Sequence, residues 1–173
     1  MQALAYWKAV TQDRSDFLDE FLALLVENGI HYAVIGGQGV NAYAEPLVSL
    51  DLDVAIATED LARVEQLLSE RFHVERFPHS INVNAEGSQL RVQLQTDPRY
   101  AAFVQRATPR EVLGVTLQVA AVEDVLQGKV WAFLDEKRRG TKRQKDLADI
   151  GRLIEAYPHL RARVPSEVIE RLI

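Results

Sequence analysis

Two aspartates, Asp51 and Asp53, stand two positions apart in the apolar run from Leu50 to Ile56. Successive side chains of a β-strand point to opposite faces, so both carboxylates project from one face and the apolar side chains from the other. Like charges this close repel each other and raise a pKa unless a cation neutralises them, and a divalent ion suits such a pair. The spacing alone leaves two interpretations open, which are a divalent metal site and a pair of solvent-facing acids on an edge strand.

A glycine pair, Gly36-Gly37, lies upstream of these acids. It directly follows the apolar run Tyr32 to Ile35, which is typical of a buried strand, and it precedes helical turns over residues 38–44. Glycines in this position let backbone N–H groups approach a phosphate at the start of a helix, although a tight turn alone would also explain them. Taken with the acid pair on the next strand, the pattern predicts a phosphate cradle beside a metal site.

The elements that must position these residues can be read from apolar periodicity. We expect strands at residues 32–35, 50–56, 72–75, 81–84, 90–95 and 115–119, with the third to fifth forming a meander. We expect helices at 15–28, capped by Gly29, and at 38–44, 58–69, 97–106, 122–134 and 143–155, with a closing helix after Pro165. This predicts an α+β (α/β-like) fold with a mixed β-sheet flanked by helices.

Length and composition exclude several classes of protein. A chain of 173 residues predicts one domain, with a strand-rich part at 15–120 and a helical part at 121–173. Twenty Lys and Arg against twenty-five Asp and Glu give a net charge of −5, which argues against coating nucleic acid by bulk charge. Without cysteine there is no disulfide, thiolate metal site or cysteine nucleophile. No apolar run is long enough to span a membrane, so we expect a soluble, cytoplasmic protein.

Two segments together resemble a known family. The first is FLALLVENGIHYAVIGGQGVNAYAEPLVSLDLDVAIATEDLARVEQLL, beginning at Phe21, and the second is VEDVLQGKVWAFLDEKRRGTKRQKDLADIGRLI. They are similar to the minimal nucleotidyltransferases of the DNA polymerase β superfamily, and most similar to the small bacterial abortive-infection and toxin–antitoxin nucleotidyltransferases. The matching positions are Gly36, Gly37, Ser49 (often threonine in the family), Asp51, Asp53, Lys129, Lys145, Asp146 and Asp149.

The resemblance implies a nucleotidyltransferase fold and transfer of a nucleoside monophosphate from an NTP to a hydroxyl acceptor. It implies that Asp51 and Asp53 are catalytic and hold Mg²⁺ or Mn²⁺. It further implies that Gly36 and Gly37 bind the nucleotide phosphates through their backbone N–H groups. Ser49 would bind them through its hydroxyl and Lys129 through its charge. The acceptor is left open between a small molecule, RNA and protein.

One departure from the family bears on activity. Active members usually carry a third carboxylate on a later strand, and Gln93 stands where we expect it. An amide coordinates metal weakly and cannot accept the acceptor's proton near neutral pH. Asp97, four residues on, could replace it only by bending back from the turn at Pro98. We therefore expect slow chemistry or none.

A basic cluster in the second segment is the densest positive patch of the chain. It comprises Lys137, Arg138, Arg139, Lys142, Arg143 and Lys145. Such a cluster is usually a solvated surface, but it could also pair with a triphosphate or an RNA backbone. We expect Asp146 and Asp149 to form salt bridges with this cluster rather than to bind metal. Five aromatic residues are expected to pack in or against the core, namely Tyr6, Trp7, Trp131, Phe133 and Tyr157.

These observations leave three functions. The first is a metal-dependent nucleotidyltransferase. The second is a catalytically degenerate member of the same fold that acts as a binding or regulatory, antitoxin-like module with a partner protein. The third is a plain RNA-binding domain, which the negative net charge makes the weakest of the three.

Overall fold

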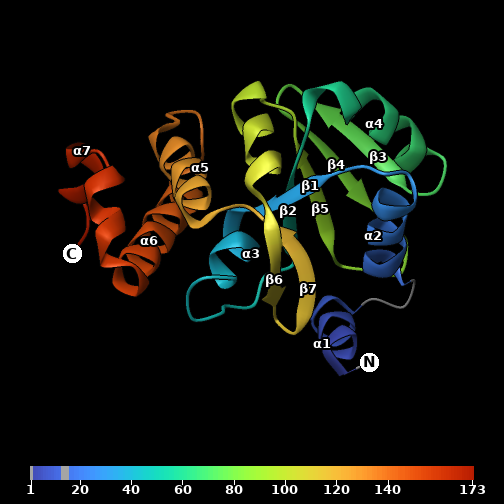
Figure 1. Ribbon diagram of the computed structural model, residues 1–173, viewed down its shortest axis with the longest axis horizontal. Coiled ribbons are helices and arrows are strands. Elements are labelled where there is room, and N and C mark those ends of the chain that lie inside the picture. Colours follow the sequence, from blue (N-terminus) through green and yellow to red (C-terminus); the bar gives the residue numbers. More distant parts are fainter. Residues whose placement is uncertain (1, 13–15) are drawn as a thin grey trace.

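The computed structural model describes residues 2–12 and 16–173, and within them seven strands form one mixed sheet (Figure 1). Their order across the sheet is β3-β4-β5-β2-β1-β7-β6. The strands are β1 (Tyr32–Ile35), β2 (Asp51–Ile56), β3 (His73–Phe77), β4 (Ser80–Asn84), β5 (Arg91–Gln95), β6 (Thr108–Val112) and β7 (Val115–Val119). The sheet confirms the predicted α+β class with a mixed sheet.

The strand pairing places β2 in the interior of the sheet. It pairs antiparallel with β1 and parallel with β5. The expected meander is confirmed, because β3, β4 and β5 pair antiparallel in sequence. The sequence did not predict β6, which pairs antiparallel with β7 at the sheet edge. Its Pro109 and charged neighbours hide the strand pattern, and an edge is where a strand tolerates proline.

The helices lie on both sides of the sheet, with α2 and α4 toward one side of the molecule and α5, α6 and α7 toward the other (Figure 1). The α-helices are α1 (Gln2–Thr11), α2 (Phe17–Glu27), α3 (Gly36–Asn41), α4 (Leu61–Ser69), α5 (Val122–Leu134), α6 (Gly140–Ala156) and α7 (Ser166–Ile169). Short 3₁₀ segments are η1 (Thr58–Asp60), η2 (Pro98–Arg106) and η3 (Pro158–Arg163).

Several helix predictions need correction. The expected helix over 97–106 is a 3₁₀ helix, and α6 begins at Gly140 rather than near Arg143. The helix expected at 38–44 begins with the glycine pair itself. We did not predict α1. The predicted start of the first helix at Ser15 lies outside the described residues, whereas its end at Gly29 is confirmed by a left-handed φ of 65°.

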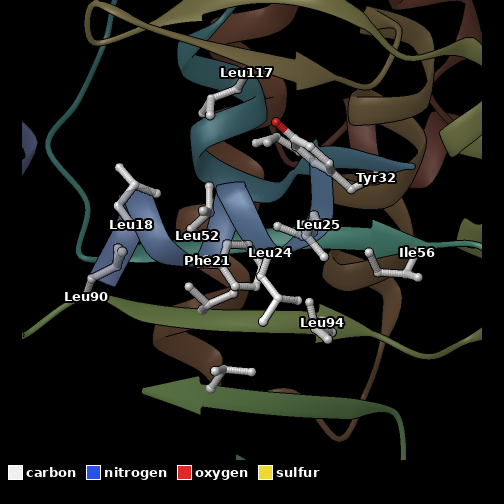
Figure 2. Close-up of a cluster of buried hydrophobic side chains, with 14 of the residues drawn as sticks. Leu18, Phe21, Leu24, Leu25, Tyr32, Leu52, Ile56, Leu90, Leu94 and Leu117 are labelled. Atoms are coloured by element: carbon white, nitrogen blue, oxygen red, sulfur yellow. The ribbon is translucent and has the colours of Figure 1, made fainter. Parts of the chain in front are cut away.

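The two faces of the sheet are buried in separate hydrophobic clusters. Side chains Leu52, Val54 and Ile56 of β2 point to the cluster formed with α2 and α4, and α2 packs its leucines and Phe21 onto the strands there (Figure 2). Ala55 points to the second cluster, with side chains of η2, α5 and α6. The second face of β2 therefore carries the two aspartates, next to the helical last third of the chain.

No helix in the described part of the chain is long and apolar enough to cross a membrane.

Candidate active site

The acid pair stands on one face of β2, as the alternation predicted. Asp51 and Asp53 are partly exposed, whereas the intervening Leu52 is fully buried. The strand lies between β1 and β5, so the edge-strand part of the alternative interpretation is wrong, whereas Asp51 does face solvent. Asp51 accepts a hydrogen bond from the Arg91 Nε at 2.7 Å, and both side chains of this ion pair are substantially exposed.

Gly36 makes room for the second acid. Ile35 pairs with Asp53 across the β1–β2 ladder, so the next residue lies directly against the carboxylate. A Cβ added to Gly36 would stand 2.3 Å from the Asp53 Oδ2, and its φ of 65° also favours glycine. A Cβ added to Gly37 would meet no atom within 4 Å, and Gly37 lines the cavity. Contact of either glycine with a phosphate remains a prediction.

Gln93 lies beside Asp53, at the place where the third carboxylate was expected. The two residues are register partners in the parallel β2–β5 ladder. Asp97 does not replace the missing acid, because it caps η2 and its carboxylate accepts hydrogen bonds from the backbone and guanidinium of Arg99. The oxygen ligands next to each other on the sheet are therefore two carboxylates and one amide.

Ser49 reaches the cavity through a loop that two buried amides hold. Asn41 donates to the Leu47 carbonyl at 2.7 Å and accepts from the Leu47 N–H at 2.9 Å. Gln38 donates to the Ser49 carbonyl at 3.2 Å and accepts from Asn41. The Ser49 Oγ itself accepts from the Asp51 N–H at 3.2 Å. Sequence analysis did not predict the roles of Gln38 and Asn41, because they bind the backbone of a loop that has no periodic pattern.

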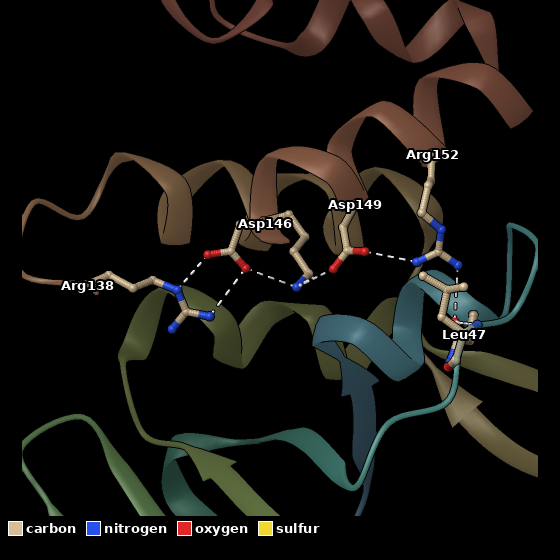
Figure 3. A network of polar contacts seen from close by, with 7 residues as sticks. Leu47, Arg138, Asp146, Asp149 and Arg152 are labelled. Carbon is tan, nitrogen blue, oxygen red and sulfur yellow. Dashed lines mark hydrogen bonds and ion pairs between the residues drawn. The ribbon is translucent and has the colours of Figure 1, made fainter. Parts of the chain in front are cut away.

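Lys129 of α5 forms the centre of a buried ionic network with Asp146 and Asp149 of α6. Its Nζ lies 3.1 Å from an oxygen of Asp146 and 2.8 Å from an oxygen of Asp149. Arg138 and Arg152 pair with the other sides of these carboxylates, at 2.5 Å and 2.9 Å (Figure 3). The expected salt bridge of Asp146 with the basic cluster is confirmed, whereas Asp149 pairs with Lys129 and Arg152, outside that cluster. Lys129 lines the same cavity as the aspartates, but its ammonium group is already paired, and its predicted role toward a phosphate stays a prediction.

One cavity lies between the sheet and the helical part formed by α5 and α6. Its sheet side carries Gly36, Ser49, Asp51, Asp53 and Gln93, and its helical side carries Lys129, Arg138, Lys142, Lys145 and Asp146. In the described structure, Lys142 and Lys145 have no ion pair or hydrogen bond to another side chain, and both are exposed. They belong to the basic cluster that the sequence singled out, but only the fold shows that these two members face the aspartates.

Burial and charge act on Asp53 in opposite directions. Burial is the largest influence and raises the pKa of the Asp53 carboxyl, Lys129 opposes it, and the nearby Asp51 raises this pKa further. A divalent cation between the two acids would favour their charged forms. Within the described residues no group of three or more His, Asp or Glu side chains is arranged to hold a metal. Two carboxylates still fit Mg²⁺, which proteins often bind through one or two carboxylates with water and substrate phosphates.

The five aromatic residues that sequence analysis placed in or against the core are not among the residues described as lining the cavity. Trp7 and Phe133 are buried as expected, Trp131 and Tyr157 are half-buried, and Tyr6 is 41% exposed. Sequence analysis did not single out Tyr100, which lines the cavity and packs edge-on against Trp131. Burial raises the pKa of its hydroxyl to about 12, so Tyr100 stays protonated at neutral pH.

Comparisons with known proteins identify relatives by structure only. No family model and no curated protein matches the sequence. The antibiotic-resistance factor ANT(2'')-Ia is 12% identical, with a TM-score of 0.55 over 88% of this chain and 92% of its own. The lincosamide antibiotic adenylyltransferase LnuA is 13% identical, with a TM-score of 0.53 over 82% of this chain and 99% of its own. TM1012 of Thermotoga maritima, a candidate nucleotidyltransferase, is 15% identical, with a TM-score of 0.52 over 80% of this chain and 97% of its own. TM-scores of 0.52 to 0.55 show that the fold is shared, and at identities of 12 to 15% they show the fold alone.

Proposed function

Starting from the nucleotidyltransferase fold that this chain shares with those structures, we propose that it transfers a nucleoside monophosphate from an NTP to a hydroxyl acceptor. The observation that carries the proposal is the placement of Asp51 and Asp53 beside Gly36, across one cavity from unpaired lysines. Acids on one wall and cations on the other are what a metal-bound polyphosphate requires. We include a cytoplasmic location, where NTPs are abundant, in this proposal.

In this proposal the two aspartates hold one or two Mg²⁺ or Mn²⁺ ions. When bound, the metal supplies charge stabilisation to the oxygens of the reacting phosphate. The N–H groups of Gly36 and Gly37 and the Ser49 hydroxyl orient the triphosphate, and Lys129 attracts it by its charge. Lys142 and Lys145 join them, because they face the acids and lack partners among the described residues. The paired ammonium of Lys129 positions Asp146 and contributes charge at longer range.

The transfer step can be written in full. The acceptor oxygen bonds to the α-phosphorus, the bond from that phosphorus to the bridging oxygen of the β-phosphate breaks, and pyrophosphate leaves with the electron pair. The hydroxyl proton passes to water or to a substrate phosphate, because Gln93 cannot accept it. Positioning and electrostatics then supply most of the rate, and the step is slow for want of a base.

The acceptor is left open between a small molecule, RNA and a protein side chain. Of the proteins that share the fold, ANT(2'')-Ia was solved with adenylyl-2''-tobramycin and LnuA with lincomycin. These complexes favour a small molecule as the first class to test.

A second function is favoured by two observations at the same site. Gln93 lies beside Asp53 in place of an acid, and Arg91 already pairs with Asp51. Both would suit a catalytically degenerate, regulatory or antitoxin-like module that binds a partner protein. The Arg91 pair is solvent-exposed, and exposed ion pairs contribute only about 0–1 kcal/mol, so a divalent cation could displace it. We therefore rank the enzyme first.

Label transfer separates the two functions. The protein is incubated with each α-³²P-labelled NTP, Mg²⁺, and in turn small hydroxyl compounds, total RNA and total protein, beside the Asp51→Ala/Asp53→Ala variant. Label transferred above that variant supports the enzyme, and none above it removes the enzyme. Calorimetric titration with MgATP then decides whether the degenerate chain still binds nucleotide.

A further inference from the structure

Among the described elements, no α-helix has its main contacts on one face of the half-sheet formed by β3, β4 and β5. The side chains of the other face, such as Val74, Ile81 and Leu94, point to the cluster shared with α2 and α4. On the opposite face, η2 packs on β1 and β2, and α5 packs on β1 and α3. The alternate residues of β3 to β5 are therefore left on an open surface that continues directly from the aspartates.

Strand register turns this surface into a polar row that ends at the acid pair. Glu75 pairs with Asn82, Asn82 with Gln93, and Gln93 with Asp53. A flanking row runs from Ser80 to Gln95. The surface thus leads from the sheet edge to the reacting carboxylates without interruption.

The side chains of this surface are mostly uncharged groups that both donate and accept hydrogen bonds. They are the amides of Asn82, Asn84, Gln93 and Gln95. The Gln95 Oε1 accepts from the Asp97 N–H at 3.1 Å, which leaves its NH₂ group for the cavity that it lines. The Asn82 Oδ1 is buried and has no hydrogen-bond partner in the described structure. An unpaired buried acceptor costs about 1–3 kcal/mol, which a donor from a ligand would recover.

The charge on this surface excludes two kinds of occupant. Among the described residues of this surface, the basic side chains are Arg91, which pairs with Asp51, and His73, the register partner of Asn84. Two basic groups are too few for a polyanion such as RNA. Apart from Asp51 and Asp53, the described carboxylate of this surface is Glu75. The surface therefore lacks the acidic cluster that a polyamine would require. The exposed ring of Phe77 adds one apolar platform at the outer edge. Amides with an exposed ring suit a neutral, hydroxyl-rich molecule.

The position of the surface also suits an acceptor. In the strand order, β5 is the neighbour of β2 on the side away from β1. Gln93 and Gln95 of β5 line the same cavity as the two aspartates. The surface therefore opens into the cavity at the place where an acceptor hydroxyl would have to lie.

We propose that the open face of β3, β4 and β5 is the acceptor site, and that the acceptor is a neutral polyhydroxylated small molecule of the glycoside class. Asn82, Asn84 and Gln95 hold its hydroxyl groups, and the reacting hydroxyl lies over Gln93, next to Asp53. This inference rests on the proposed nucleotidyl transfer for its reaction, but binding to the face can be measured without nucleotide.

Ligand-observed NMR tests the face directly. Methyl glucoside, methyl mannoside, sucrose and trehalose are presented to the full chain without nucleotide or metal. We expect binding of at least one of them, weakened at least tenfold by Asn82→Ala/Asn84→Ala and unchanged by Gln66→Ala, an exposed residue on α4 at the opposite face. The melting temperature and the MgATP affinity of the face variants should match the wild type.

Each result has a definite meaning. No binding of any of the four glycosides, or binding that the Asn82→Ala/Asn84→Ala variant leaves intact, overturns the acceptor inference. Label transfer to RNA or protein in place of a glycoside overturns it as well. If glycosides bind in the predicted way but MgATP does not bind, the proposed function fails while the face remains a glycoside site.

Discussion

Gly36 and Gly29 share a left-handed φ of 65° but differ in what surrounds them. A Cβ on Gly29 meets nothing within 4 Å, whereas one on Gly36 collides with the Asp53 carboxylate. Gly29→Ala should therefore cost about 1–2 kcal/mol of unfolding free energy, which is the backbone term alone. Gly36→Ala should cost about 1–3 kcal/mol more, because the collision adds overpacking. Urea unfolding of both variants checks this, and equal losses would mean that Asp53 does not hold the observed position.

Lys129 carries a second prediction at the residue scale, concerning stability. It is 6% exposed and lies between two buried carboxylates. Lys129→Met should lower the unfolding free energy by about 3–5 kcal/mol, because each aspartate then keeps only one arginine partner. The matched control is Lys137→Met on the exposed loop before α6, which should change it by less than about 0.5 kcal/mol. If Lys129→Met lowers the unfolding free energy by much less, Asp146 and Asp149 do not depend on Lys129 in the way described.

At the scale of elements, the β2–β5 register makes Gln93 the position to restore. Gln93→Glu adds a third carboxylate beside Asp53, which supplies a metal ligand and a base. Label transfer with Mg²⁺ should rise by about a hundredfold, the range of general base catalysis. Thermal stability without metal should fall, since the new charge repels Asp53, and recover when Mg²⁺ is added.

The control for that gain lies outside the cavity. Gln66→Glu adds the same charge at an exposed position of α4, on the opposite face of the sheet. It should not raise the transfer rate. If both variants raise it equally, added negative charge rather than a third ligand is responsible.

The elements also show why only part of the site was predictable. Period-two alternation at 50–56 placed both acids on one face, and the glycine pair marked the strand end beside them. The contact of Gly36 with Asp53 and the Arg91 pair follow from strand register, which the sequence does not display. The edge strand β6 was missed because Pro109 interrupts its pattern.

At the scale of the whole molecule, the site exists only where the first two thirds of the chain meet the last third. The sheet supplies the acids, and α5 and α6 supply the cations across the cavity. Helical periodicity predicted α5 and α6 but not which of their faces turns to the sheet, because the six cations of the cluster look alike in sequence. This is why Lys142 and Lys145 were not separated from Lys137 and Arg139.

Nucleotide binding should therefore depend on both walls. Lys142→Ala/Lys145→Ala should weaken MgATP binding at least about tenfold, which corresponds to about 1.4 kcal/mol, because two charge-assisted contacts to phosphate are lost. Lys137→Ala/Arg139→Ala removes two cations that do not line the cavity and should leave the affinity within about twofold. Calorimetry at two salt concentrations measures both variants. Equal weakening by the two pairs would indicate general attraction rather than a phosphate site.

Manganese binding tests the central claim most directly. Electron paramagnetic resonance follows free Mn²⁺ as protein is added in the presence of a non-hydrolysable ATP analogue, for the wild type and for Asp51→Asn/Asp53→Asn. We predict that the wild type takes up one or two Mn²⁺ ions together with the analogue, and that the variant takes up none beyond those bound by the analogue alone. Identical uptake by the two proteins, or no uptake by the wild type, would contradict the assignment of the aspartates as metal ligands.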